Sequence, residues 1–142
     1  MFDDLVEYVC EKYSRASKIV ELGVGSRIEV AEKIKKSLPL AEVLVTDKDE
    51  SWVRKHVTGQ VRAVADDVRF PQTPIYQNAS LVYSIQPPIE IVEPMVVLAR
   101  RIGADLLVVP MSDEQESFHQ DQWEKLVRNG RTLGWLRVHR RH

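Results

Sequence analysis

Apolar positions recur along the chain in two alternating rhythms, one helical and one extended. Apolar residues three and four positions apart predict an amphipathic helix over residues 2–14. A short apolar run then predicts a strand over Lys18–Leu22. The next helix is expected to begin after Ser26, which would form a capping box with Glu29, and to end before Pro39. The N-terminal part of the chain therefore has the order helix, strand, helix.

The same alternation continues through the middle of the chain. The expected strands are Ala41–Thr46, Gln60–Ala65 and Leu81–Ile85. A short helix is expected near Ser51–Val57, a longer one over about Glu90–Ile102, and a loop or irregular turn over Phe70–Asn78. The apolar strands are typical of strands that are buried on both faces. Because strands alternate with helices, the pattern favours a mainly parallel sheet covered on both sides.

The C-terminal part continues with a strand and two further elements. We expect a strand at Asp105–Pro110, a helix around Phe118–Val127 and a last strand at Thr132–His139. Alternation along the last strand would place Leu133, Trp135 and Arg137 on one face. The whole pattern predicts an α/β fold, a Rossmann-like three-layer sandwich with about six strands.

Composition limits the class of protein. The 142 residues, 44% hydrophobic and 29% charged, predict one domain over residues 1–142. No apolar run approaches the roughly 18 residues that span a bilayer, and the acidic N-terminus lacks an export signal, so we expect a cytoplasmic protein with no membrane contact. The single cysteine, Cys10, excludes an intramolecular disulfide, and no histidine or cysteine pattern predicts a metal site.

Positive charge gathers at the end of the chain. Residues 128–142 contain five arginines, two histidines and no acidic residue, while the formal net charge of the whole chain is −1. A basic segment of this kind can contact phosphates, which predicts RNA binding through Arg137, Arg140 and Arg141. The alternative is a last strand with its polar residues in water, followed by a solvated end.

Two glycines and two acids form the most informative motif. Glu21, Gly23 and Gly25 follow a buried strand and precede a helix, where a tight turn can bring backbone amides close to a ligand. Asp47 ends the next strand and can accept the hydroxyls of a ribose, provided that Asp49 caps the following short helix instead. The motif predicts a nucleotide-type cofactor at the edge of the sheet.

With these motifs in place, the chain resembles the class I S-adenosylmethionine-dependent methyltransferases. The resemblance runs from Lys18 to Pro110 and implies that Glu21, Gly23 and Gly25 form the cofactor turn. The third glycine of that family's motif falls on Arg27 in this chain. The resemblance implies S-adenosylmethionine as the cofactor.

The same resemblance assigns roles to three further strand ends. It implies that Asp47 holds the ribose hydroxyls of the cofactor and that Asp67, with Asp66 as the alternative, reads the adenine amino group. Gln86, followed by two prolines, stands where the family carries its strand-four catalytic motif, and Ile89 stands in place of an aromatic residue. A glutamine can accept a hydrogen bond from a substrate amine but cannot act as a general base.

The chain is also similar to a short, uncharacterised archaeal family with a truncated Rossmann-like fold. The Glu21–Gly25 turn, the sequence Thr46–Asp49 and the Gln86–Pro88 segment carry this similarity. Membership implies the fold and leaves the activity open.

Three functions fit these observations. The first is an S-adenosylmethionine-binding, methyltransferase-like protein whose acceptor substrate the sequence does not define. The second is a non-enzymatic, degenerate Rossmann module that acts as a partner or RNA-associated subunit. The third is a binder of an NAD-type dinucleotide, although Ile28 stands where that motif has its final glycine.

Overall fold

The computed structural model describes residues 2–23, 25, 27–56, 59–111, 118 and 122–140 of the chain. Its helices are α1 (Asp3–Lys12), α2 (Glu29–Ser37), α3 (Glu50–Lys55) and α4 (Val92–Ile102), with 3-10 turns η1 (Thr73–Tyr76) and η2 (Ile89–Ile91). Its strands are β1 (Lys18–Leu22), β2 (Glu42–Asp47), β3 (Arg62–Ala65), β4 (Leu81–Ile85), β5 (Asp105–Val109), β6 (Glu124–Arg128) and β7 (Arg131–Arg137).

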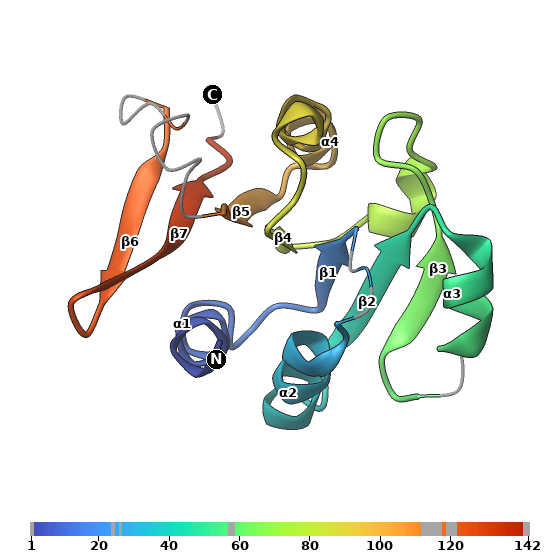
Figure 1. The fold of residues 1–142 in the computed structure, drawn as a ribbon. Helices are drawn as coiled ribbons and strands as arrows, with labels where there is room; N and C mark the ends of the chain where they lie inside the picture. The colour runs from blue at the N-terminus through green and yellow to red at the C-terminus, as the bar shows by residue number, and fades with distance from the viewer. Residues whose placement is uncertain are drawn as a thin grey trace.

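These elements form three layers, with one sheet between two layers of helices (Figure 1). Apolar side chains of α1, α2 and α3 pack on one face of the sheet, and those of α4 and η1 pack on the other. The central strands are therefore buried on both faces, as their continuous apolar runs predicted. Val20 and Leu22 face α4, whereas Ile19 faces α1 and α2, which is the alternation expected of a strand.

The sheet has seven strands in the order β3-β2-β1-β4-β5-β7-β6. β1 to β5 are parallel, and β7 is antiparallel to both β5 and β6. The predicted fold class, a Rossmann-like α/β sandwich with a mainly parallel sheet, is confirmed. The chain leaves β1 for α2 on one face and leaves β4 for α4 on the other face, so the order of the strands reverses between β1 and β4.

The helix predicted around Phe118–Val127 is wrong, because β6 occupies Glu124–Arg128. A tight turn at Asn129 and Gly130 joins β6 to β7, and both residues have positive φ, at 53° and 73°. This is the geometry for which an Asn-Gly pair is the strongest hairpin signal. The sheet therefore has seven strands, where about six were predicted.

The predicted common face of Leu133, Trp135 and Arg137 is also wrong. Leu126 pairs with Gly134 while Val127 pairs with Thr132, so Leu133 is an extra residue in β7. Such a bulge turns the side chains that follow it to the opposite face. Leu133 therefore packs toward the α1 side of the sheet, whereas Trp135 packs toward α4.

The start of α2 differs from the predicted capping box. Ile28 occupies the N-cap position of α2, and an isoleucine side chain has no hydrogen-bond acceptor to offer. Glu29 is therefore the first residue of the helix rather than its third, while Ser26 lies outside the described residues.

Polar contacts hold the hairpin to the N-terminal helix. The Arg128 guanidinium donates to the Glu11 carboxylate at 2.8 and 3.2 Å, and the Asn129 amide donates to the Asp4 carboxylate at 3.3 Å. Leu126 and Leu136 of the hairpin belong to the same apolar core as α1. The last strands and the first helix thus form one packed unit.

Gly134 offers a direct test of the bulged hairpin. A Cβ at this position would lie 2.6 Å from the carbonyl oxygen of Val108, a backbone atom that the sheet holds in place. We expect Gly134→Ala to lower the free energy of unfolding by about 1–3 kcal/mol, measured by urea denaturation. Gly59→Ala is the control, because its Cβ would meet its nearest atoms at 3.9 Å and should change stability by less than about 0.5 kcal/mol. Equal stability of the two variants would contradict the placement of β7.

Candidate functional site

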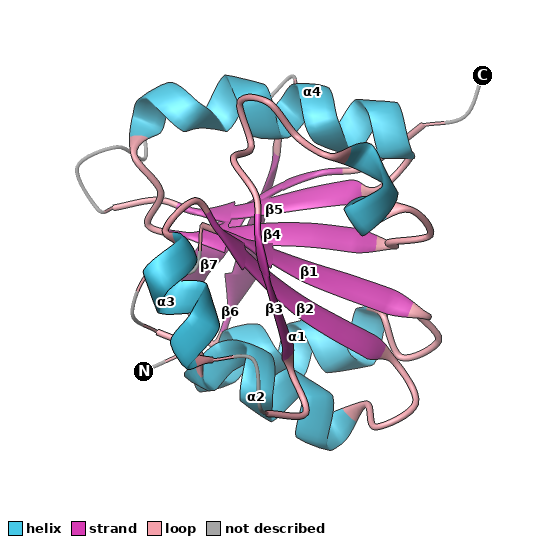
Figure 2. Ribbon diagram, turned by 90° about the vertical axis from the view of Figure 1, so that its right-hand side faces the viewer, coloured by secondary structure: helices cyan, strands magenta, loops and turns pink. Residues whose placement is uncertain are grey.

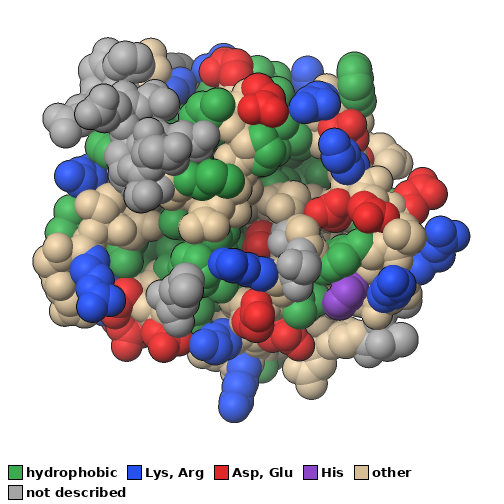
Figure 3. All heavy atoms as spheres, in the orientation of Figure 1, with side chains coloured by type: hydrophobic (Ala, Val, Ile, Leu, Met, Phe, Trp, Pro, Cys, Tyr) green, Lys and Arg blue, Asp and Glu red, His purple; other side chains and the backbone are tan. Residues whose placement is uncertain are grey.

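The candidate site lies at the carboxyl edge of the sheet, between β1 and β4. In open α/β sheets, ligands bind beyond the carboxyl ends of the strands where the strand order reverses. Figure 3 faces this edge, with acidic and basic side chains interspersed among apolar ones. Five of the predicted site residues lie at or beyond strand ends here: Gly23 and Gly25 after β1, Asp47 at the end of β2, Asp67 after β3 and Gln86 after β4. The sixth, Glu21, lies within β1.

The glycine turn is built by backbone conformation. Gly23 and Gly25 are exposed and have φ values of 60° and 62°, which side chains with a Cβ rarely adopt. A Cβ added at either position would meet none of the described atoms within 4 Å. The glycines therefore permit the turn itself, and none of the described atoms crowds them. Arg27, at the position of the missing third glycine, is exposed.

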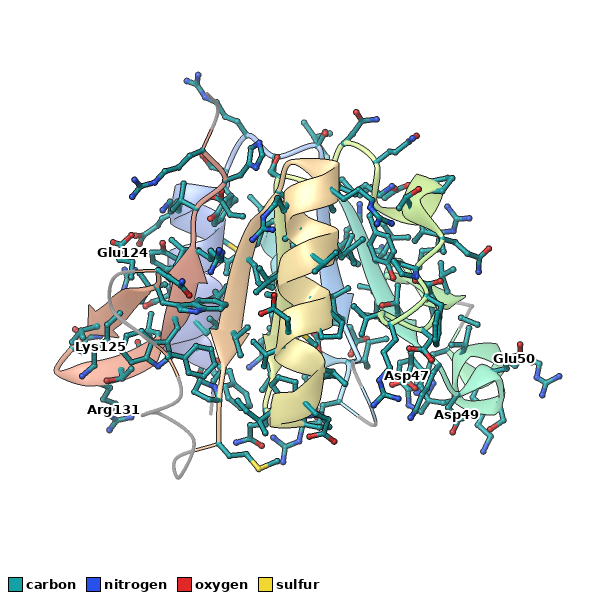
Figure 4. The ribbon with its side chains drawn as sticks, turned by 90° about the horizontal axis from the view of Figure 1, so that it is seen from above. Asp47, Asp49, Glu50, Glu124, Lys125 and Arg131 are labelled. Atoms are coloured by element: carbon teal, nitrogen blue, oxygen red, sulfur yellow. The ribbon has the colours of Figure 1, made fainter. Side chains whose placement is uncertain are left out.

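Asp47 connects this turn to the end of β2. Its Oδ2 accepts a hydrogen bond from the Gly25 amide at 2.9 Å, and its Oδ1 accepts one from the Asp49 amide at 2.9 Å. Asp49 in turn caps α3, because its carboxylate accepts from the amides of Ser51 and Trp52 at 3.0 and 3.2 Å. Figure 4 shows Asp47 and Asp49 beside each other at the start of α3. Asp49 thus takes the capping role, and Asp47 stays at the strand end.

Glu21 lies beneath the turn rather than in solvent. The residue is 2% exposed, and its Oε1 accepts a hydrogen bond from the Tyr83 hydroxyl at 2.8 Å. Burial raises the pKa of Glu21 to about 8, although the Tyr83 hydrogen bond opposes that effect. The register of β1 on β4 sets Glu21 directly opposite Tyr83. Sequence reasoning missed this tyrosine, because the pairing joins two residues that are 62 positions apart in the chain.

Ser84 marks the point where β1 and β4 separate. The ladder between the two strands ends at the pair Glu21 and Tyr83, and the Ser84 hydroxyl then donates to the Leu22 carbonyl at 2.8 Å. Both residues are buried, so this bond gives the Ser84 hydroxyl a partner within the protein. A serine in an apolar strand was the available sequence signal. The separated strand ends form the base of the candidate site.

The two adjacent acids after β3 face different surroundings. Asp66 is buried, and its carboxylate accepts from the Gln72 amide at 3.1 Å and from the Tyr76 hydroxyl. It therefore anchors the segment around η1. Asp67 is half-buried and accepts from the Arg69 amide at 3.0 Å. This arrangement favours Asp67 over Asp66 as the acid that faces a ligand, and its role stays a prediction.

Gln86 has an unusual backbone conformation. Its φ is 53°, a left-handed value that costs residues with a Cβ free energy, and its amide donates to the Val109 carbonyl at 2.6 Å. Its side chain is exposed at the carboxyl edge, while Pro87 is buried behind it. Strained residues of this kind cluster at functional sites. The contacts of Gln86 with a ligand stay a prediction.

Other classes of site find less support. Within the described ranges, no group of three or more His, Cys, Asp and Glu side chains could hold a metal ion. Among the same residues, no helix is both long and apolar enough to cross a bilayer. Arg137 and Arg140 of the basic tail lie near the amino ends of the strands, at the other edge of the sheet, and Arg141 lies outside the described residues.

The pKa of Glu21 predicts a pH-dependent stability. An unfolded glutamate has a pKa near 4.3, so between that value and about 8 the folded chain retains a proton that the unfolded chain releases. The stabilisation is present in full below about pH 4 and is lost as the pH rises to about 8. We expect Glu21→Gln to be more stable than the unchanged protein by a few kcal/mol at pH 8, with little difference at pH 4. Thermal or urea unfolding across this range measures the effect.

The exposed Glu50 provides the control for this series. Glu50→Gln should change stability by less than about 0.5 kcal/mol, because Glu50 lies in solvent. A Glu21→Gln difference that does not vary with pH would show that Glu21 is not buried in its protonated form.

The strain at Gln86 can be measured by comparing two substitutions. Gln86→Gly should raise the free energy of unfolding by up to about 1 kcal/mol, because glycine adopts a positive φ without the cost of a Cβ. Gln86→Ala keeps the Cβ and should not show this gain. Chemical denaturation of both variants gives the difference, and equal stabilities would contradict the left-handed conformation.

Comparison with solved structures supports the fold. The chain is similar to an O-methyltransferase family protein from Burkholderia thailandensis, with a TM-score of 0.62, 12% identity, and coverage of 95% of this chain and 55% of that one. It is also similar to the plantazolicin methyltransferase BpumL in complex with SAH, with a TM-score of 0.54, 18% identity, and coverage of 80% and 47%. The chain thus spans about half the length of these structures. The fold is methyltransferase-like.

Comparison of sequences identifies relatives in archaea. A UPF0146 protein from Pyrococcus horikoshii is 35% identical over 101 residues, which are 71% of this chain and 76% of the relative. The model of the uncharacterised protein family UPF0146 matches residues 2–137. The similarity to a short archaeal family that the sequence motifs predicted is therefore confirmed, and the chain belongs to the UPF0146 family.

Proposed function

We propose that this protein binds S-adenosylmethionine at the carboxyl edge of its sheet and acts as a methyltransferase-like protein. The observation that carries the proposal is the hydrogen bond from the Gly25 amide to the Asp47 carboxylate. It joins the glycine turn after β1 to an acid at the end of β2, beside the point where the strand order reverses. Glycines at positive φ, a strand-end acid and a reversal point together favour a nucleoside ligand.

Asp47 retains the capacity to hold a ribose. Each of its oxygens accepts one backbone amide, and an ionised carboxylate offers about four lone-pair positions in total. Two ribose hydroxyls can therefore be accepted without breaking either bond. The two amide bonds fix the orientation of the carboxylate, which reduces the entropy cost of binding.

The remaining predicted residues have distinct places in the proposal. Gly23 and Gly25 would let the methionine part of the cofactor approach the backbone, and Asp67 would accept the adenine amino group from the end of β3. Glu21 would support the glycine turn from beneath rather than contact the cofactor from solvent, because it is buried against Tyr83. Gln86 would orient the group that receives the methyl, at the end of β4.

The chemistry asks little of the protein itself. Methyl transfer requires that a nucleophile lie in line with the methyl group and that water be excluded. Gln86 can hold an acceptor by hydrogen bonds but cannot remove its proton at neutral pH. The acceptor would therefore be a group that is nucleophilic without a strong base, such as an amine.

Calorimetric titration with S-adenosylmethionine, S-adenosylhomocysteine and NAD tests the proposal. We expect micromolar binding of the first two ligands and at least 10-fold weaker binding by Asp47→Asn, because the amide keeps only one acceptor oxygen. Asp49→Asn is the matched control: it removes the same charge from the same turn, and asparagine still caps α3. It should bind like the unchanged protein.

Three results would contradict the proposal. Binding of none of the ligands would exclude both cofactor functions and leave the non-enzymatic module. Binding of NAD alone would indicate the dinucleotide alternative. Equal loss in the Asp47 and Asp49 variants would attribute the effect to the charge of the turn rather than to ribose recognition.

A further inference from the structure

A concave surface lies at the opposite edge of the sheet from the candidate cofactor site. A groove of about 750 Å³ runs between α4 on one side and the end of β7 with the tail that follows on the other. Figure 2 shows that this tail leaves the molecule on the side away from the carboxyl ends of the parallel strands. The walls carry Arg100 from α4, and Arg137, His139 and Arg140 from β7 and the tail.

Positive charge is concentrated in this groove, although the net charge of the chain is close to zero. Its lining includes three arginines and one acidic residue, Glu124, while the formal net charge of the whole chain is −1. Arg100 and Arg140 are exposed, so their guanidinium groups are available to a ligand. The cations stand on both walls, so an anion lying in the groove would be contacted from two sides.

Arg137 is held in place by a group of aromatic side chains. Its guanidinium carbon lies 5.8 Å from the centre of the Trp123 ring, a cation–π arrangement. Trp123 meets Phe118 edge to face at 5.0 Å, and Phe118 stacks on Trp135 at 5.8 Å. Trp123 and Trp135 are buried, so they form a rigid base for a half-buried cation. A guanidinium fixed before binding loses little entropy when a phosphate arrives.

The tail wall of the groove is also fixed to the sheet. The His139 amide donates to Asp105 Oδ1 at 2.8 Å, and Asp105 Oδ2 accepts from the Tyr13 hydroxyl at 2.7 Å. The His139 ring packs against Gly103, where a Cβ would lie 3.5 Å from its Nε2. These contacts continue past the end of β7 and hold Arg140 opposite α4.

We propose that this groove binds the phosphate backbone of a single-stranded nucleic acid. Guanidinium groups carry the charge opposite to that of phosphate, and their N–H donors are spaced to bind two phosphate oxygens at once. A single strand can lie between the two walls and meet cations from both of them. A duplex carries its phosphates on the outside of a wide cylinder and would meet only the rim. The groove is separate from the cofactor site, so this proposal does not depend on cofactor binding.

Fluorescence anisotropy with labelled strands of about 12 nucleotides tests the proposal. The probes are single-stranded RNA, DNA of the same sequence, a DNA duplex and a free nucleoside monophosphate as competitor. We expect the single strands to bind more tightly than the duplex and more tightly than the monophosphate. Tighter binding of RNA than of DNA would assign the strand to RNA, and the reverse would assign it to DNA. Absence of binding, or a duplex that binds as tightly, would overturn the proposal.

Substitution of Arg100, Arg137 and Arg140 by glutamine locates the binding surface. The triple variant should lose at least 10-fold in affinity, and its slope of log K against log salt should fall by about 2, because each phosphate contact contributes about 0.7. The matched control replaces three exposed arginines elsewhere, Arg54, Arg62 and Arg131, with the same change in net charge. In Figure 4, Arg131 lies at the end of the hairpin away from the tail.

A folding defect must be separated from a binding defect. Thermal unfolding checks the triple variant, and Arg140→Gln alone, at an exposed tail position, should still weaken strand binding several-fold if the triple variant does not fold. Equal losses in the groove variant and the control variant would attribute binding to net charge and overturn the assignment. Failure of S-adenosylmethionine binding would leave this result unaffected.

Discussion

Burial of the central strands on both faces is the constraint on which the rest of the structure depends. β1 and β4 lie between two apolar cores, so a polar group on either strand needs a partner within the protein. Glu21 finds that partner in Tyr83, and Ser84 finds it in the carbonyl of Leu22. Both bonds lie where the strands separate. The requirement to satisfy buried polar groups therefore shapes the base of the candidate site.

The predictions from sequence succeeded where one element alone determines the pattern. Lys18–Leu22 and Leu81–Ile85 were predicted with the bounds that the structure gives, because strands buried on both faces are unbroken apolar runs. The β6–β7 hairpin was not predicted, because Trp123 and Leu126 have the spacing of a helix. The Asn-Gly turn and the bulge at Leu133 determine the structure that forms instead. Alternation cannot reveal a bulge, since an extra residue leaves no mark in composition.

In the candidate site, too, features within one segment could be predicted from the sequence, whereas contacts between distant segments could not. The glycine turn and Asp47 could be predicted as neighbours, since parallel strands end at one edge. The bond between Asp47 and Gly25 depends on how the turn folds, and the bond between Glu21 and Tyr83 depends on strand register. At the other edge, the basic tail was visible in the sequence. Its opposing wall at Arg100 and the aromatic base under Arg137 emerge only from packing.

The contacts between α1 and the β6–β7 hairpin have a consequence for synthesis of the chain. Arg128 is synthesised 117 residues after its partner Glu11 in α1, and Asn129 is synthesised 125 residues after its partner Asp4. Until the β6–β7 hairpin has emerged from the ribosome, the apolar face of α1 lacks its contacts with Leu126 and Leu136. A nascent chain halted before residue 128 would thus leave α1 without its contacts to the hairpin and leave β5 without a partner on its β7 side. The packing of α1 is therefore complete only after the β6–β7 hairpin has been synthesised.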